Sequence, residues 1–242
     1  MNRPDWPDLA RLYDVVEATW PAAGSRRSGP WRIREGAGGG KRVSATTAEG
    51  DWQPGDIAAA EAAMTALGQD RLFMIRKGDD ALDAELERRG YRVIDPVVIY
   101  LADAADIDAG PPPPVSSFEI FPPLAIMREI WAEGGIGPGR LAVMARVQGV
   151  KTAILSRHKD RAAGVSFVAL DGDIAMIHAI EVNHDMRRQG CGNNILRAAG
   201  HWSTTNGARF FALIVTNAND AANSLYAKLK MNRVGAYHYR IK

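Results

Sequence analysis

Apolar runs and helical spacings alternate along the second half of the chain. Residues 174–182 form one continuous apolar run typical of a buried strand, and residues 193–205 carry apolar side chains at the spacing of one helix face. A second apolar run, 210–215, suits a strand that is covered on both faces. Residues 219–229 predict a helix opened by a polar cap, and residues 234–241 predict a last strand. Strands and helices that alternate in this way predict an α/β fold.

Shorter elements precede this series within the same half. The pattern predicts strands over 118–121, 152–156 and 165–170, and helices over 124–132 and 140–147. Asp171 and Gly172 favour a tight hairpin turn into the strand 174–182. Together these elements predict a mixed, mostly antiparallel central sheet flanked by helices.

The first half carries an α/β series of its own. We expect helices over 6–19, 57–67 and 81–89, a hairpin over 31–47, and strands over 72–75 and 92–101. The helix-turn-strand that begins at Leu86 parallels the one that begins at Tyr226, which suggests an internal duplication into two similar lobes. Common helix-turn-strand endings could also produce this likeness by chance.

A proline-rich segment predicts where the two lobes join. Residues 103–114 end in four consecutive prolines, which disfavour a helix and favour an extended linker. We therefore expect one lobe over 1–110 and a second over 115–242. The glycine run 36–40 resembles a phosphate loop only superficially, since Glu35 and Arg42 occupy positions that require Gly and Ser or Thr. A flexible hairpin loop is the simpler interpretation.

Composition narrows the classes of protein. A hydrophobic content of 46% with 24% charged residues is ordinary for a globular chain, and a net charge of +2 without a long basic block disfavours a nucleic-acid partner. The one cysteine, Cys191, excludes an internal disulfide and fits a reducing compartment. Neither an apolar signal core at the N-terminus nor a run of about 20 apolar residues is present. A cytoplasmic protein without a membrane segment is expected.

The segment 187–192, Arg-Arg-Gln-Gly-Cys-Gly, carries the most distinctive chemistry. It stands between the strand 174–182 and the helix that follows. Successive backbone N–H groups at a helix start bind anions, and glycines let the anion approach closely. The segment therefore predicts a cradle for a pyrophosphate.

A second motif follows this cradle at a fixed distance. The two motifs are Arg-x-x-Gly-x-Gly at Arg187, Gly190 and Gly192, and Asn-x-x-Ala-x-x-Leu-Tyr at Asn219, Ala222, Leu225 and Tyr226. In this order they resemble the GNAT superfamily of acyl-CoA-dependent N-acyltransferases. The first lobe lacks the cradle motif, so the chain is similar to a tandem-lobe GNAT protein whose N-terminal lobe is degenerate.

This resemblance implies a site for acetyl-CoA as the acyl donor. The backbone N–H groups that it assigns to the pyrophosphate are those of Gln189, Gly190, Cys191, Gly192 and Asn193. It implies that Arg187 and Arg188 add positive charge. The main chain of Ile180 to Val182 is expected to pair with the pantetheine arm, and Asn219 and Tyr226 are expected near the thioester.

Transfer to an amine requires a base for the amine and a proton donor for the departing thiolate. Tyr226 is the candidate acid, with packing against the sheet as its alternative role. Glu181 and His178 are the candidate bases on the strand before the cradle. Many relatives carry a glutamate earlier on this strand, where Met176 stands here. His178 could instead be a hydrogen-bonded core residue, Glu181 could pair with a nearby arginine, and a water could relay the proton.

The sequence thus predicts an N-acyltransferase that moves an acetyl or other short acyl group from CoA to an amine by direct attack. The acceptor is a small molecule or a peptide, and its identity and the oligomeric state stay open. The histidines lack metal-ligand spacing, so no metal site is predicted. The alternative is a non-catalytic acyl-CoA-binding or sensor protein, which the Met176 departure and the degenerate first lobe motivate.

Overall fold

The computed structural model describes residues 5–242. Its larger sheet has eight strands in the order β4-β11-β5-β10-β9-β8-β7-β6, and its smaller sheet has the order β1-β2-β3. The strands are β1 Gly24–Ser28, β2 Trp31–Glu35, β3 Thr47–Ala48, β4 Leu72–Ile75, β5 Arg92–Asp103, β6 Ser117–Glu119, β7 Lys151–His158, β8 Arg161–Asp171, β9 Ile174–Val182, β10 Phe210–Thr216 and β11 Asn232–Ile241. The helices are α1 Leu9–Thr19, α2 Lys41–Ser44, α3 Asp56–Ala66, α4 Asp80–Arg88, α5 Ala104–Ile107, α6 Ala125–Glu133, α7 Pro138–Arg146, α8 Cys191–Thr205 and α9 Asp220–Lys228. The predicted α/β fold with a mostly antiparallel sheet is confirmed.

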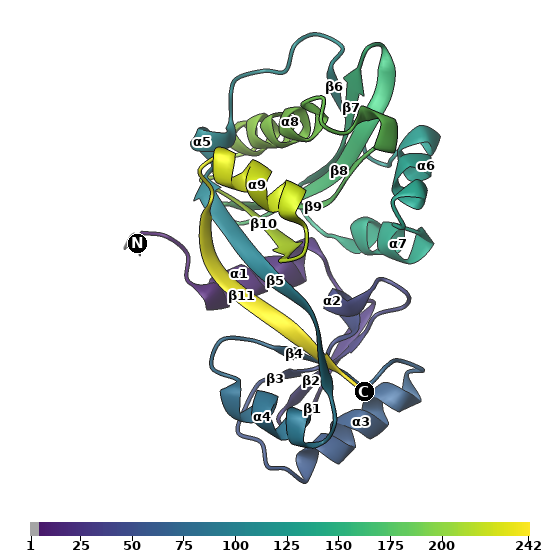
Figure 1. Cartoon of the computed structure of the whole chain (residues 1–242), viewed down its shortest axis with the longest axis vertical. Helices are drawn as coiled ribbons and strands as arrows, with labels where there is room; N and C mark the ends of the chain where they lie inside the picture. The colour runs from purple at the N-terminus through teal and green to yellow at the C-terminus, as the bar shows by residue number, and fades with distance from the viewer. Residues whose placement is uncertain (1–4) are drawn as a thin grey trace.

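The larger sheet is antiparallel at every pairing except that of β9 with β10. The long strands β5 and β11 pair with each other and run from the upper part of the molecule into the lower part (Figure 1). At their lower ends β11 pairs with β4. The sheet is therefore continuous between the two lobes.

Alternating side chains divide the core between the two faces of this sheet. Ala175 and Ile177 of β9 point to the face covered by α8, where they pack with Leu196. Ile174 and Met176 point to the other face, where they pack with α1. Helices α6 and α7 cover the same face as the end of α1, since Trp131 and Val143 share a cluster with Trp20. This alternation follows from the two-residue period of a strand.

The two lobes exchange elements across the predicted boundary. Helix α1 comes from the first half of the chain but packs on β8 and β9 of the second half. In return, β11 completes the sheet beside β4 and β5 of the first half. The division into 1–110 and 115–242 stays a prediction, because neither part holds a complete set of its own packing partners.

The predicted hairpin over 31–47 differs from the structure. Its two ends do pair antiparallel, Trp31 with Ala48 and Arg32 with Thr47, but residues 41–44 between them form the short helix α2, and β2 pairs over a longer stretch with β1. The main chain of Thr46 bonds to Leu72 and Met74 of β4 at 2.9 Å each. Contact with β4 therefore accompanies a pairing of β2 with β3 that is limited to two residue pairs.

Candidate functional site

A split opens between the parallel strands β9 and β10. Their pairing ends at Ile177 and Leu213, although β9 continues to Val182 and β10 to Thr216. Ala179 has a positive φ of 51°, and the register of β9 against β8 shifts beside it. Such a bulge bends its strand and interrupts the ladder. The edge of β9 that faces β10 is thus left without a strand partner beyond Ile177.

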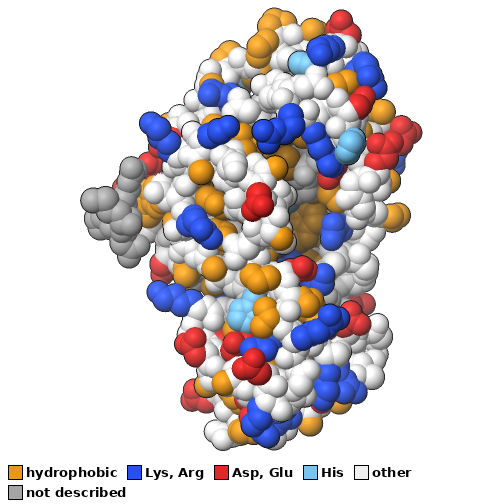
Figure 2. All heavy atoms as spheres, in the orientation of Figure 1, with side chains coloured by type: hydrophobic (Ala, Val, Ile, Leu, Met, Phe, Trp, Pro, Cys, Tyr) orange, Lys and Arg blue, Asp and Glu red, His pale blue; other side chains and the backbone are white. Residues whose placement is uncertain are grey.

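A cavity of about 620 Å³ adjoins the split on the face covered by α8 and α9, and we call it the α9-side cavity. Figure 2 shows the surface hollowed beside α9, with basic side chains above the hollow. Its lining includes Ile180, Glu181, Val182, Arg187, Arg188, Gly190, Cys191, Gly192, Asn193, Asn219 and Tyr226. Of the residues that the sequence predicted for the site, Gln189 and His178 do not line this cavity. The Gln189 side chain instead bonds to Lys159 and to the Asp185 carbonyl.

The glycine turn places the start of α8 at this cavity. Gly190 precedes the helix in the left-handed conformation, with φ 84°, which favours glycine. No side chain caps the first turn, so its free N–H groups have no side-chain acceptor. A Cβ at Gly192 would approach Leu225 at 3.3 Å, so this glycine allows α8 to lie close to α9.

The two arginines of the turn behave differently. Arg187 donates to a Glu181 carboxylate oxygen at 3.0 Å and to the Val182 carbonyl at 3.1 Å. Arg188 makes no hydrogen bond or ion pair with any of residues 5–242 and lines the cavity. Its charge is therefore available to an anion. Cys191 is buried, and this burial raises the pKa of its thiol, which disfavours a reactive thiolate.

Tyr226 projects from α9, whose N-cap Asn219 accepts a hydrogen bond from the Ala222 backbone at 3.1 Å. The Tyr226 ring lies 5.3 Å from that of Tyr100. Burial, and secondarily Tyr100, raises the pKa of the Tyr226 phenol, which therefore keeps its proton at neutral pH. Its hydroxyl has no hydrogen-bond partner in the part of the chain that the structure describes. The phenol can thus donate a proton or a hydrogen bond into the cavity that it lines.

Glu181 stands where the end of β9 meets the end of α6. One carboxylate oxygen accepts the hydrogen bond from Arg187, and the other has no hydrogen-bond partner among the described residues. A Cβ on Gly134 would collide with this carboxylate, so the glycine makes room for it. The side chain is 18% exposed and lines the α9-side cavity. The arginine pairing weighed for Glu181 is present, and one oxygen is left to accept a proton.

His178 has a hydrogen-bond partner at each of its two ring nitrogens. Its Nε2 lies 2.9 Å from Thr19 Oγ1, and the Thr19 hydroxyl donates to the Val15 carbonyl at 2.6 Å. Its Nδ1 lies 3.2 Å from Arg42 Nη1. Arginine can only donate, so Nδ1 accepts, and Nε2 carries the proton that Thr19 accepts. Both ring nitrogens of the neutral imidazole are therefore engaged.

The surroundings of His178 also favour the neutral imidazole. The ring lies 4.9 Å from that of Trp20 and the residue is 4% exposed. Burial, and secondarily the Arg42 charge, lowers the pKa of His178 well below its ordinary value. This geometry favours the hydrogen-bonded core role for His178 over that of a base. Met176, on the same face, is fully buried against α1, and its thioether cannot serve as a carboxylate base.

A second cavity of about 220 Å³ borders the split from the opposite face, and we call it the α1-side cavity. It is lined by Trp20, Gly39, Gly40, Lys41, Arg42, Asp95, Val97, Ile136, Arg140, Ala179, Thr216, Tyr237 and Tyr239. Sequence reasoning missed this cavity because its walls come from segments throughout the chain. The only local signal was the glycine run before Arg42, which predicted a loop and no site.

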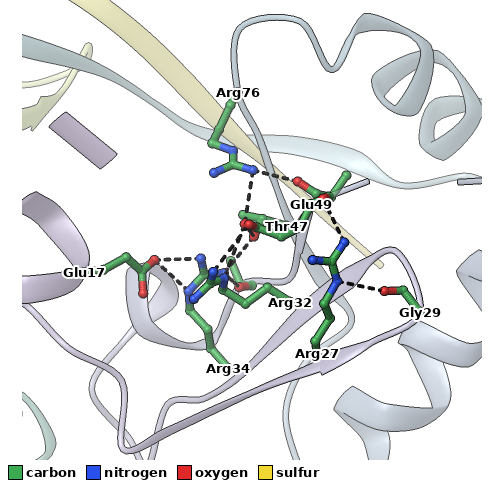
Figure 3. A network of polar contacts seen from close by, with 10 residues as sticks. Glu17, Arg27, Gly29, Arg32, Arg34, Thr47, Glu49 and Arg76 are labelled. Carbon is green, nitrogen blue, oxygen red and sulfur yellow. Dashed lines mark hydrogen bonds and ion pairs between the residues drawn. The ribbon is translucent and has the colours of Figure 1, made fainter. Parts of the chain in front are cut away.

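A polar network ties the segment just after α2 to β2 and α1 (Figure 3). Arg34 of β2 is buried and bonds to Glu17 of α1 at 2.6 Å and to the Ala45 carbonyl at 2.8 Å. It also bonds to Thr47, whose hydroxyl donates to Glu49 at 3.0 Å. The segment after α2 is thereby tied to α1, which carries Trp20 at its C-cap.

None of the helices in residues 5–242 combines the length and apolar character needed to cross a membrane. Within the same residues, no three His, Cys, Asp or Glu side chains gather into a group that could hold a metal ion.

Comparison with known proteins finds relatives for the second half of the chain and for the whole of it. Residues 138–231 match the family model described as Acetyltransferase (GNAT) family. The chain is 25% identical over 244 residues to the uncharacterized N-acetyltransferase YobR of Bacillus subtilis (strain 168), an alignment that covers 97% of this chain and 99% of that protein. The matched segment contains the glycine turn and Tyr226.

Solved structures share the fold. A GCN5-related N-acetyltransferase from Kribbella flavida superposes with a TM-score of 0.70 at 16% identity, covering 98% of this chain and 96% of that one. A tandem GNAT protein from the clavulanic acid biosynthesis pathway superposes with a TM-score of 0.58 at 11% identity, covering 76% and 67%. At these identities the likeness concerns the fold alone.

Proposed function

We propose that this protein transfers an acetyl or short acyl group from CoA to an amine, and the match of residues 138–231 to the GNAT acetyltransferase family model supports this. The observation that carries the proposal is the uncapped glycine turn of α8 at the α9-side cavity, beside the split in the sheet. An uncapped helix N-terminus with open glycines attracts a phosphate group.

Acetyl-CoA is the proposed donor. Its pyrophosphate would bind the N–H groups of residues 189–193, with Arg188 as the free positive charge. The exposed edge of β9 over residues 180–182 would hydrogen-bond the pantetheine amides. Arg187 already donates to the Val182 carbonyl, so we assign it to shaping this edge and pairing with Glu181.

The proposed chemistry is direct attack in a ternary complex. The amine nitrogen bonds to the thioester carbonyl carbon, the carbon–sulfur bond breaks, and the thiolate leaves. Tyr226 would donate the proton that the thiolate takes up, since its phenol stays protonated at neutral pH. The free oxygen of Glu181 would accept the amine proton, directly or through water. His178 is left out of the catalytic set because both of its ring nitrogens are engaged.

A non-catalytic acyl-CoA-binding role is the second candidate. The buried Met176, which stands where many relatives carry a glutamate, favours it. Slow turnover of acetyl-CoA that disappears in Tyr226→Phe would exclude this candidate. The cytoplasmic location stays an expectation, which fractionation of the producing cells would test.

The test is thermal unfolding with and without acetyl-CoA. At a ligand concentration about 100 times its Kd, linkage predicts roughly 2.7 kcal/mol of stabilisation, which corresponds to a rise in Tm of several degrees. The Gly190→Glu variant should lose this shift because a carboxylate would face the phosphates. Gly190→Ala is the matched control, since it carries the same backbone strain at positive φ without the charge. A wild type without any shift would refute the CoA site.

A further inference from the structure

We propose that the α1-side cavity binds the acceptor, and that the acceptor is a small amine that carries a carboxylate, such as a free amino acid. The proposal rests on the proposed acyltransferase function and adds the substrate class to it. It begins from the position of the two cavities relative to the split between β9 and β10.

The two cavities border the same split from opposite faces of the sheet. The α9-side cavity is lined by Ile180 and Val182 of β9 together with α8 and α9. The α1-side cavity is lined by Ala179 of β9 and Thr216 of β10, on the two sides of the unpaired stretch. A thioester that lies along β9 would therefore meet an amine held in the α1-side cavity. Glu181 follows Ala179 by two residues on β9 and lines the α9-side cavity.

The charges of the α1-side cavity do not cancel. Lys41 donates to Asp95 at 2.7 Å, and this pair is neutral. Arg42 and Arg140 have no carboxylate partner among residues 5–242, and both line the cavity. The Arg140 side chain makes no hydrogen bond within that part of the chain, and the Nε of Arg42 is buried without a partner. Two guanidinium groups at one small cavity, neither with an anionic partner among residues 5–242, predict an anionic group on the ligand.

Arg42 is oriented before any ligand arrives. Its Nη1 donates to His178 Nδ1 at 3.2 Å, and His178 is fixed in turn by Thr19. An imidazole that accepts from arginine leaves the positive charge of the guanidinium uncompensated. A carboxylate at this position would have compensated it. His178 is thus a positioning residue that holds Arg42 as a free cation.

The size and the other walls of the cavity specify the ligand further. A volume of about 220 Å³ lies below the roughly 300–1,000 Å³ of pockets for drug-sized ligands, so it suits a small metabolite. Planar guanidinium forks match the two oxygens of a carboxylate. Trp20, Val97 and Ile136 add apolar walls that can receive a small side chain. A compact amino acid meets these three conditions.

The experiment measures binding and turnover with matched pairs of amines. Glycine, L-alanine, L-leucine and L-phenylalanine are compared with methylamine, ethylamine, isoamylamine and phenethylamine, which lack only the carboxylate. Binding is measured by calorimetry on the full chain saturated with CoA, and turnover by release of the CoA thiol from acetyl-CoA. We expect at least one amino acid to bind roughly ten- to hundredfold more tightly than its counterpart, the effect of charge-assisted hydrogen bonds.

Variants connect this preference to the cavity. Arg140→Met and Arg42→Met should each remove most of the preference by raising the Kd of the amino acid, without changing that of the counterpart amine. Arg128→Met is the matched control, because Arg128 is exposed on α6 and lines neither cavity, and it should keep the preference. Arg140 is exposed, so its variant keeps the test valid even if Arg42→Met fails to fold.

Three results would overturn the inference. These are equal binding of amino acids and their counterparts, a preference that survives both arginine variants, and a stronger preference for a phosphorylated amine such as phosphoethanolamine. A failure of the proposed function can be told apart from a failure of this inference, because it would also remove the thermal shift with acetyl-CoA. If the protein binds amino acids and their counterpart amines equally but still shows the thermal shift with acetyl-CoA, only the proposed acceptor class is refuted.

Discussion

The neutral state of His178 predicts a specific dependence of stability on pH. In the folded protein the imidazole is buried, accepts from Arg42 and has a pKa well below its ordinary value. In the unfolded chain its pKa returns to about 6.5. As the pH falls through this value, the unfolded state binds a proton that the folded state does not bind. Stability contributed by His178 is therefore present above about pH 6.5 and is lost below it.

The magnitude follows from linkage. Each pH unit well below the unfolded pKa costs about 1.4 kcal/mol of unfolding free energy while the folded imidazole stays neutral. Integrated from about pH 7.5 to pH 5, the loss is about 2 kcal/mol. His178→Asn removes the titratable group and keeps an oxygen that can accept from Arg42. The variant is expected to be less stable overall, but its stability should fall less over this pH range.

Urea denaturation of both proteins at half-unit steps from about pH 7.5 to pH 5 measures the difference. The other ionisable groups contribute equally to wild type and variant, so the difference between the two curves isolates His178. We expect the gap in unfolding free energy to narrow by about 2 kcal/mol toward pH 5. A constant gap would refute the reasoning, because it would mean that the imidazole takes up its proton in the folded state as readily as in the unfolded chain.

Three further predictions concern the site and its support. Glu181→Gln should lower kcat by a factor of about 10² or more if the free oxygen accepts the amine proton, while the thermal shift with acetyl-CoA is kept. An unchanged kcat would mean that another group is the base. Gly134→Ala introduces a Cβ that collides with the same carboxylate, so it should lower kcat in the same direction, and crystallography of the variant should find Glu181 displaced. Arg34→Met should lower the free energy of unfolding, measured by urea denaturation, by about 1–3 kcal/mol, because Glu17 loses its partner. The loss stays in this range because the Glu17 side chain is 37% exposed and can be hydrated. An unchanged free energy of unfolding would contradict the network of Figure 3.

Much of the fold could be predicted because its signals are local. The strand over 174–182 and the helices after it begin and end close to where the apolar spacing and polar caps indicated. Asn219 is the observed cap of α9, and its type and position were readable from the sequence. The antiparallel pairing of β2 with β3 agrees with the predicted hairpin over 31–47, but it is limited to two residue pairs, because the chain between them forms α2 and Thr46 bonds to the distant Leu72 and Met74.

The candidate site likewise has one part that the sequence predicted and another that it did not. The cradle at Gly190 requires only backbone N–H groups and a positive φ, so a short motif suffices to predict it. The interpretation of His178 could not be settled from the sequence, since its role depends on Thr19 and Arg42, more than 130 positions away. Periodicity carries no information about contacts at such separations.

The sequence by itself determined the alternation of strands and helices, the glycine turn and the two motifs that resemble the GNAT superfamily, because each arises from neighbouring residues. Only the tertiary structure decided that α1 and β11 exchange between the lobes, that β9 and β10 separate beyond Ile177, and that Arg42 and Arg140 face a cavity at that split. These features depend on packing between segments that are distant in the chain. Their free energies come from burial and pairing that no local pattern encodes.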